Sequence, residues 1–364
     1  MSKLLTTDLK LERPDFVPVK DYEIALQGLK MFNKQEAARQ DQLKRDLDAL
    51  WDKVKAKRIA LVGQELYDKF MAVQGELRTK FLKAEGDEKA QYQINNELKA
   101  FIERANFPID KFSQIFLDSA QIFYKIIDAS NGPVGETKKE LDINVGEAMQ
   151  KNNGNCFDKY NNPWSALRFG TYARWNGYTH TNEHGGDAAT GRLDSKIGGL
   201  CRNGDGFDEI VAHNHTLQEG WVHSGNGGIL RAFVLYKLNK VHHNFNSIDE
   251  EWVFSNAYHR QENHGMFHVI HPHVTGWRRT LLTQLPSQSL RDHHDRQFIE
   301  HRPTSPGEYM WGVMDSRNAL PANQWVYVRF GHSLNLDGSS ENYKINTNMD
   351  VSSVIETMFI MCNP

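Results

Sequence analysis

The feature that most constrains the fold is a nearly uninterrupted helical pattern from Asp21 to about Ala84. It contains two sets of apolar residues in which successive members are 4, 3 and 4 residues apart. The first set is Leu43, Leu47, Leu50 and Val54, and the second is Leu66, Phe70, Val73 and Leu77. This spacing is typical of the a and d positions of a coiled coil. The register slips near Gly63, so the pattern predicts either one long helix with a stutter or two helices end to end.

A helix of this length needs a partner along it, because some 60 residues at about 1.5 Å each would span roughly 90 Å. Gly86-Asp87 predicts a turn, and further helices are expected over Asp87–Arg104 and Asp110–Ala129. The last of these is apolar over a surface wide enough to require burial on more than one side. We therefore expect an elongated helical or coiled-coil stalk, with a helical hairpin packed back on it or on other copies of the chain.

The second half of the chain has a different composition. All 16 histidines lie between His180 and His332, and seven of the eight tryptophans follow residue 150. Short β segments separated by turns are expected at Ala166–Tyr172, Ile229–Leu238, Glu251–Tyr258, Met266–His273, Trp325–Phe330 and Val354–Met361. The runs AFVLY and VIETMFIM lack clean alternation, which indicates strands buried on both faces.

These patterns predict an α+β chain with three parts. Residues 1–20 are expected to form an extended anchor, residues 21–150 the helical stalk, and residues 151–364 a jelly-roll-like β-sandwich with a binding role. The boundary is expected near Ser130–Pro133 or near Asn152–Asn155, where turn-forming residues cluster.

Charge and cysteine content exclude several classes of protein. The 43 Lys and Arg against 46 Asp and Glu give a net charge of −3, which leaves no basic excess for nucleic acid. We expect no membrane span and no export signal, because no sufficiently long apolar run is present. Three widely spaced cysteines, Cys156, Cys201 and Cys362, argue against a disulfide framework.

Two His-X-His elements, His213-Asn214-His215 and His271-Pro272-His273, are candidate metal ligands. Residues i and i+2 of a strand point to the same face, so each element presents two imidazoles together. Around a three-fold axis one element would supply six imidazoles, the number in an octahedral transition-metal site. This arrangement resembles metal-stapled bacteriophage fibre tips, and the resemblance implies iron or zinc on the axis of a homotrimer.

A second arrangement lies within one chain. His213, His215 and Glu219 have the internal spacing of the first cupin metal motif, which they resemble, and this ligand set suits Fe, Mn or Zn. Both flanking glycines are one residue too far away, and no second cupin motif is present. A fourth ligand would have to come from His268, His271 or His332.

The remaining polar motifs are less specific. The loop Asn203–Glu209 has alternating oxygen ligands for calcium, but it lacks the length of an EF-hand loop, and a plain turn is favoured. The other histidines are expected to be hydrogen-bonding groups or, alternatively, a pH-responsive cluster. No nucleotide-binding glycine motif, nucleophile elbow or zinc-protease motif occurs, so a binding protein is favoured over an enzyme.

Tryptophans supply the candidate receptor-binding residues. Trp175, Trp221 and Trp277 are flanked by glycine and polar residues, the mixture from which sugar-binding surfaces are built. Trp252 and Trp325 lie in or next to apolar runs and are expected in the core.

The architecture as a whole resembles bacteriophage tail fibres and other virion appendages. The resemblance implies a homotrimer made in the host cytoplasm, attached to other virion structural proteins by its N-terminal part, with a C-terminal domain that binds a host-surface glycan or protein receptor. Two alternatives remain open at this point: a cupin-type metal-dependent enzyme with a helical oligomerisation domain, and a pore-forming toxin whose hairpin is Asp110–Ala129.

Overall fold

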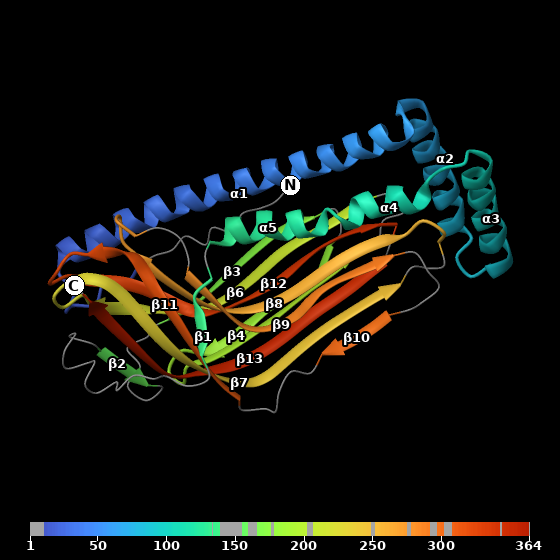
Figure 1. Ribbon diagram of the computed structural model, residues 1–364. Helices are drawn as coiled ribbons and strands as arrows, with labels where there is room; N and C mark the ends of the chain where they lie inside the picture. The colour runs from blue at the N-terminus through green and yellow to red at the C-terminus, as the bar shows by residue number, and fades with distance from the viewer. Residues whose placement is uncertain are drawn as a thin grey trace.

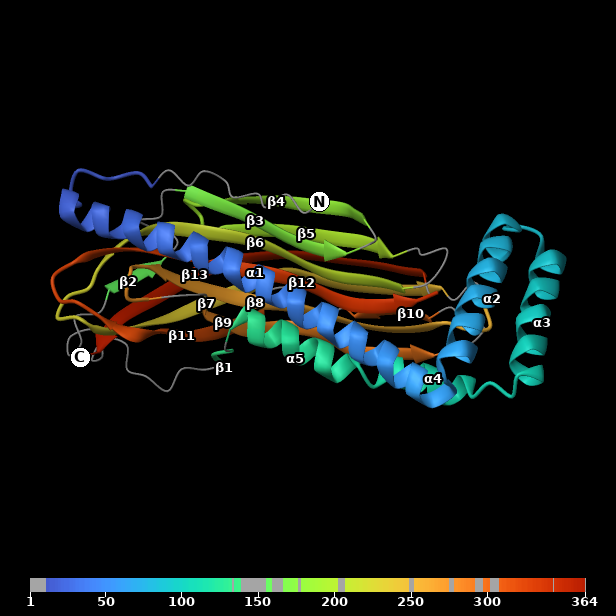
Figure 2. The same ribbon diagram turned by 90° about the horizontal axis from the view of Figure 1, so that it is seen from above.

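The chain folds into three layers: a helical layer, a five-stranded sheet beneath it, and an eight-stranded sheet beneath that (Figures 1 and 2). The computed structural model describes residues 11–132, 134–138, 155–158, 166–175, 178–201, 207–248, 252–274, 278–291, 297–301, 308–342 and 344–363. The N-terminal helices and the C-terminal antiparallel sheets make this an α+β fold, as expected from the sequence.

Five helices are found among the described residues. They are α1 (Val19–Val62), α2 (Gln64–Lys83), α3 (Glu88–Arg104), α4 (Ile109–Leu117) and α5 (Ala120–Asn131). Gly63 lies between α1 and α2 with a φ of 82°, a conformation that residues with side chains disfavour. The long helical segment predicted from the sequence is therefore two helices and not one. Asp87 caps α3 by accepting a hydrogen bond from Ala90 N at 3.0 Å. The α2–α3 hairpin projects beyond one end of the sheets (Figures 1 and 2).

Both apolar seams of the helices are filled within the chain. Leu43, Leu47 and Leu50 of α1 pack in one cluster with α5 and with two residues of the five-stranded sheet, Val211 and Tyr258. The second seam, on α2, packs with α3, α4 and the segment that contains Trp252 and Phe254. The α1 helix therefore lies along the sheets and does not project as a stalk, because the sheet itself supplies the partner surface that the heptad spacing requires.

The five-stranded sheet runs antiparallel in the order β3 (Ala166–Trp175), β6 (Phe207–His223), β12 (Trp325–Glu341), β8 (Asn256–Ile270) and β9 (Arg278–Arg291). The main path of the eight-stranded sheet is β1 (Glu136–Lys138), β11 (Glu308–Leu320), β7 (Gly228–Ile248), β13 (Lys344–Asn363), β5 (Arg192–Cys201) and β4 (Tyr178–Asp187). Two short strands complete it, with β10 (Gln297–His301) on β7 and β2 (Asn155–Asp158) on β13. The helix α5 ends at Asn131 and β1 begins at Glu136, near the first of the two expected boundary positions.

The five-stranded sheet is the middle layer, so it is buried on both faces. Every residue of β8 is buried, and so is nearly every residue of β12. The run AFVLY lies in β7, and its consecutive residues Ala232, Phe233 and Val234 are all buried, as expected of a strand buried on both faces. The run VIETMFIM was also expected to be buried on both faces, but it lies in β13 of the outer sheet, where buried and half-buried residues are mixed. The physical reason is that helices cover the five-stranded sheet on its outer face and leave the eight-stranded sheet uncovered by helices (Figure 1).

The expected apolar helix Asp110–Ala129 is two helices, because the chain turns at Asp118–Ser119 between α4 and α5. Its phenylalanines Phe112, Phe116 and Phe123 are almost completely buried against α1, α2 and the sheet. The expectation that this surface needs burial on more than one side is thereby confirmed. No helix of the described residues is both long and apolar enough to cross a membrane.

Residues 11–18, which belong to the expected extended anchor, pack on the far end of the five-stranded sheet. Val17 is fully buried, and the carbonyl of Glu12 accepts a hydrogen bond from Trp221 Nε1 at 3.2 Å. Asp21 at the start of α1 accepts from the backbone N–H of Trp325 at 2.9 Å.

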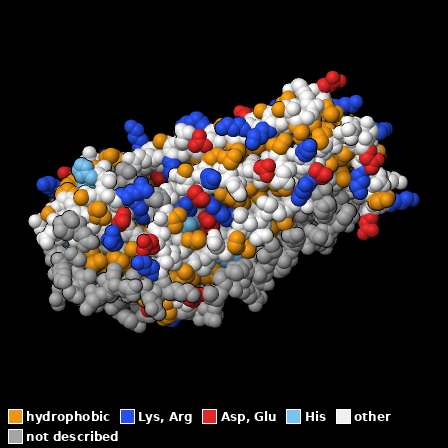
Figure 3. All heavy atoms as spheres, viewed as in Figure 1, with side chains coloured by type: hydrophobic (Ala, Val, Ile, Leu, Met, Phe, Trp, Pro, Cys, Tyr) orange, Lys and Arg blue, Asp and Glu red, His pale blue; other side chains and the backbone are white. Residues whose placement is uncertain are grey.

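On the outer face, Lys and Arg side chains alternate with acidic ones over α1 and the hairpin (Figure 3), as on a solvated helix surface.

Candidate functional site

The face of the middle sheet that meets the helices is apolar at its two ends and polar at its centre. Strand alternation sends the odd-numbered residues of β6 and β12 and the even-numbered residues of β8 to this face. At one end lie Val211 and Tyr258, and at the other Trp221 and Tyr327. The polar residues between them are His213, His215, Arg260, Glu262, His264, Ser333, Asn335 and Asp337. A polar layer enclosed between helices and sheet is the first indication of a site.

Arg260 organises one side of this polar layer. Its guanidinium donates to both carboxylate oxygens of Asp128 on α5, at 3.1 Å each, and to Asp337 Oδ2 at 3.0 Å. His213 Nε2 lies 3.4 Å from Asp337 Oδ1. Burial alone would raise the pKa of Asp337, but the hydrogen bond from His213 and the charge of Arg260 outweigh it and lower that pKa to about 2. Asp337 is therefore an anion at neutral pH, and its orientation is fixed.

Arg279 organises the other side. It donates to Asp128 Oδ1 at 3.1 Å and to the carbonyl of Gly132 at 3.2 Å, and its Nη1 lies 3.2 Å from His264 Nε2. The same imidazole nitrogen lies 2.9 Å from Glu262 Oε2. Burial lowers the pKa of His264 despite that carboxylate. Asp128 is shared by Arg260 and Arg279, so one carboxylate at the end of α5 fixes two arginines of the sheet.

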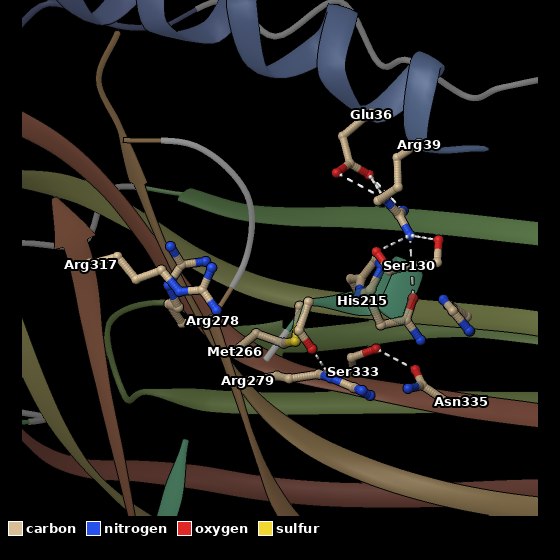
Figure 4. Close-up of a pocket in the computed structure, with 13 residues that line it drawn as sticks. Glu36, Arg39, Ser130, His215, Met266, Arg278, Arg279, Arg317, Ser333 and Asn335 are labelled. Atoms are coloured by element: carbon tan, nitrogen blue, oxygen red, sulfur yellow. Dashed lines mark hydrogen bonds and ion pairs between the residues drawn. The ribbon is translucent and has the colours of Figure 1, made fainter. Parts of the chain in front are cut away.

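A cavity of about 200 Å³ opens beside this network, between α1, the end of α5 and the sheet (Figure 4). Its lining residues come from seven elements and the turn after α5, and they are Glu36, Arg39, Ser130, Asn131, Gly132, His213, His215, Met266, Arg278, Arg279, Arg317, Ser333 and Asn335. An adjoining hollow shares Gly132, Arg279 and Arg317 with it and includes Asp128, Glu262 and His264. These two neighbouring hollows are together called the polar cleft.

The lining groups on the helix side are held in place. Arg39 donates to Glu36 at 2.7 Å and to the Ser130 hydroxyl and carbonyl at 3.0 and 3.1 Å. Across the cavity, burial beside His213 and Arg39 lowers the pKa of His215 to about 3. His215 is therefore neutral at pH 7 and presents one hydrogen-bond donor and one acceptor. Such a fixed polar lining suits ligand binding, because little ordering remains to be done on association.

The three expected cupin-type ligands do not form one cluster. His213 and His215 lie side by side on β6, with ring centroids 6.4 Å apart. Glu219 lies on the same continuous strand, four residues from His215 and thus about 13 Å away at the usual rise. It accepts a hydrogen bond from Arg329 Nε at 3.0 Å in a buried ion pair. Within the described residues, no group of three His, Cys, Asp or Glu side chains is placed to hold a metal.

The second His-X-His element is distant from the first. The register places Glu262 of β8 beside Asn335, which pairs with His213, so His271 lies nine residues or about 30 Å further along the sheet. His271 begins a turn, where its Nδ1 accepts from His273 N at 3.2 Å. The two elements therefore do not share a site. The His213 face of β6 is also covered by α1 of the same chain, and His213 is only 3% exposed.

Of the expected receptor-binding tryptophans, Trp221 is a core residue. It is 5% exposed, donates to Glu12 and packs edge-on against Tyr327 at 5.0 Å, because the N-terminal segment covers it. Trp175 is the last residue of β3, and its side chain lies outside the described part of the structure. Trp277 and residues 203–206 of the expected calcium loop also lie outside it. Glu209 from that loop accepts a hydrogen bond from Trp51 Nε1 at 2.8 Å.

Sequence reasoning missed the arginines, Asp128, Asp337, Ser333 and Asn335. The adjacent Arg278-Arg279 pair was the one local signal, and it is too common to be specific. Other histidines are structural: His332 lies between the two sheets, 2.8 Å from Ser195 Oγ and 3.2 Å from Ser353 Oγ, and burial lowers its pKa to about 4. For His332, the expected hydrogen-bonding role is therefore observed.

Comparison of the chain with protein-family models, with curated proteins and with solved structures found no match.

Proposed function

We propose that this chain is a structural, receptor-binding component of a virus particle, of the tail-fibre type, and that it binds a host-surface glycan without cleaving it. The observation that carries the binding part is the cavity between α1, α5 and the middle sheet, with a polar lining fixed by ion pairs. Sites of this kind suit a ligand rich in hydroxyl groups, because donors and acceptors are already oriented.

The acid–base properties of the cleft favour binding over catalysis. A general acid or base works best when its pKa lies near the operating pH. The pKa of His215, which lines the cleft, is lowered to about 3, so its imidazole does not exchange a proton readily near neutral pH. His215 instead stays neutral, which suits hydrogen bonding to a ligand.

Attachment to a particle is the second part of the proposal. The N-terminal part of the chain would attach to the particle, and the α2–α3 hairpin is the portion of it that projects beyond the sheets (Figure 2). Tyr92 on this hairpin is 66% exposed, as expected of a residue that contacts a partner. A jelly-roll-like binding domain and a homotrimer belong to the same proposal. Since both heptad seams are filled within the chain, the trimer would use other surfaces than a coiled coil of α1.

The experiment is a binding screen of the purified chain against an array of neutral and acidic glycans, with its mass in solution measured by light scattering. Binding to a defined group of glycans, without release of shortened products, and a mass of three chains are expected. Turnover of a bound glycan, or no binding to any glycan on the array, would contradict the proposal. Capsid or tail genes beside the gene for this chain would support the virion assignment, and metabolic genes there would oppose it.

A further inference from the structure

We propose that the cavity binds the carboxylate of a single acidic sugar residue, with Arg317 and Arg278 as the pair that receives the carboxylate. This inference rests on the proposed glycan binding and names the class of sugar. It follows from charge, from the backbone at Arg317, and from an amide on the cavity floor.

The cavity has an excess of positive charge. Four arginines and one glutamate line it, and both histidines lie on its sheet side. Arg39 is paired with Glu36 at 2.7 Å, and Arg279 is paired with Asp128, a carboxylate that Arg260 also uses. Asp315 lies near Arg278 and accepts from the backbone N–H of Arg317, and it also lies 3.9 Å from Arg231. An anionic ligand would balance this excess.

Arg317 is placed by an irregular backbone. It is a non-glycine residue with a φ of 60°, inside the register shift of β11 between Asp315 and Ala319. Its N–H donates to Asp315 Oδ1 at 3.0 Å, and the neighbouring Ser316 hydroxyl donates to Asn318 O at 2.8 Å. Arginine disfavours this conformation, and bulges of this kind re-aim a side chain next to functional sites. Here the bulge turns Arg317 toward the cavity (Figure 4).

The guanidinium groups of Arg317 and Arg278 lie on the same side of the cavity (Figure 4). Within the ranges that the structure describes, the Arg317 side chain makes no hydrogen bond or ion pair. Burial and the positive charge of Arg317 lower the pKa of Arg278. Two like charges held together favour an anion between them, and guanidinium groups match the planar, two-oxygen geometry of a carboxylate.

The floor of the cavity offers hydrogen bonds for the rest of a sugar. Asn335 is 3% exposed, and its Oδ1 accepts from Ser333 Oγ at 2.8 Å. Its Nδ2 has no partner among the described residues, although it lines the cavity. A sugar hydroxyl in the cavity would supply an acceptor for this amide. The volume of about 200 Å³ is below the roughly 300–1,000 Å³ of larger ligand sites, so it suits one sugar residue.

The test is titration calorimetry of the full chain with glucuronate and N-acetylneuraminate, and with glucose, N-acetylglucosamine and inorganic phosphate for comparison. Both acidic sugars, or one of them, should bind at least about tenfold more tightly than the neutral sugars and phosphate, because a charge-assisted hydrogen bond is lost without the carboxylate. Arg317→Gln should weaken that binding about tenfold. Arg104→Gln, at an exposed position of α3 outside the cavity, should not change it.

Arg317→Gly separates a binding role from a structural one. Glycine relieves the left-handed backbone, so the melting temperature should stay level or rise while acidic-sugar binding is lost. Equal binding of acidic and neutral sugars, phosphate binding as tight as either acidic sugar, or unchanged binding by Arg317→Gln would overturn the inference. If the array shows only neutral glycans bound, the proposed function stands and this inference fails. If free glucuronate binds through Arg317 but no glycan on the array binds, this inference stands and the proposed function fails.

Discussion

Asp337 shows how single residues set the properties of the polar layer. It is fully buried, carries a negative charge, and is held by Arg260 and His213. Since its folded-state pKa of about 2 lies below the ordinary value of 3.8, the unfolded chain binds a proton more readily. The stabilisation is therefore complete above about pH 4 and is lost as the pH falls toward 2.

Asp337→Asn should remove this acid sensitivity. Between pH 5 and pH 2 the wild-type chain should lose about 1.5–2 kcal/mol more of its free energy of unfolding than the variant does. Urea unfolding at several pH values measures both losses. Asp68→Asn on the exposed face of α2 is the matched control and should keep the wild-type slope. An identical pH slope for wild type and Asp337→Asn would show that the carboxyl is not held as described.

Arg58 connects α1 to the sheet through a buried ion pair. It donates to the two carboxylate oxygens of Glu341 at 2.5 and 2.8 Å and lies over the ring of Phe112 at 4.1 Å. Arg58→Met leaves that carboxylate buried without its partner, so it should cost about 3–5 kcal/mol of unfolding free energy. Chemical denaturation measures the loss, and adding Glu341→Gln should recover part of it. Lys80→Met, in an exposed pair with Glu76, should change stability by less than about 1 kcal/mol.

These residues also show why the site was not visible in the sequence. Asp128, Arg260 and Asp337 are far apart along the chain and meet only because α5 crosses β8 and β12. The spacing of His213 and His215 correctly placed them on one face of a strand. It gave no information about the helix that covers that face, since such packing depends on contacts between distant segments.

At the scale of elements, the sequence signals that predicted the structure reliably were the residues that end or begin helices. Gly63 ends α1, and Asp87 begins α3. Strand lengths were less predictable: Trp325–Phe330 was expected as a strand, yet β12 continues to Glu341 through the polar stretch GHSLNLDGSSE. That stretch has little strand propensity, and it is extended because β6 and β8 pair with it on both sides.

Gly28 tests how closely α1 is seated on the sheet. A Cβ there would lie 2.8 Å from the backbone N and Cα of His271, which cannot move aside as a side chain can. Gly28→Ala should therefore lower the free energy of unfolding by about 1–3 kcal/mol. Gly75→Ala in α2 is the control, since a Cβ there meets nothing within 4 Å, and it should stabilise by about 0.5–1 kcal/mol. Urea denaturation of both variants gives the comparison, and stabilisation by both would mean that α1 is not seated on His271.

At the scale of the whole molecule, the question is whether the helices and sheets are one cooperative unit or a stalk joined to a separate domain. The α1 helix shares its apolar cluster with Val211 and Tyr258, and residues 11–18 share another with Trp221 and Tyr327. A projecting stalk would leave these parts of the middle sheet exposed. Elements that share a core unfold together, whereas separate domains can unfold at different temperatures.

Leu47→Ala distinguishes the two arrangements, because Leu47 is fully buried in the cluster between α1, α5 and the sheet. Helix content followed by circular dichroism and the surroundings of the tryptophans followed by fluorescence should give one coincident thermal transition. The substitution should lower that transition for both signals together, by an amount corresponding to about 2–5 kcal/mol. In a stalk, the helix signal would fall at lower temperature while the fluorescence of the β domain stayed at its wild-type midpoint. Two separated transitions would therefore mean that the helical layer and the middle sheet do not share a core.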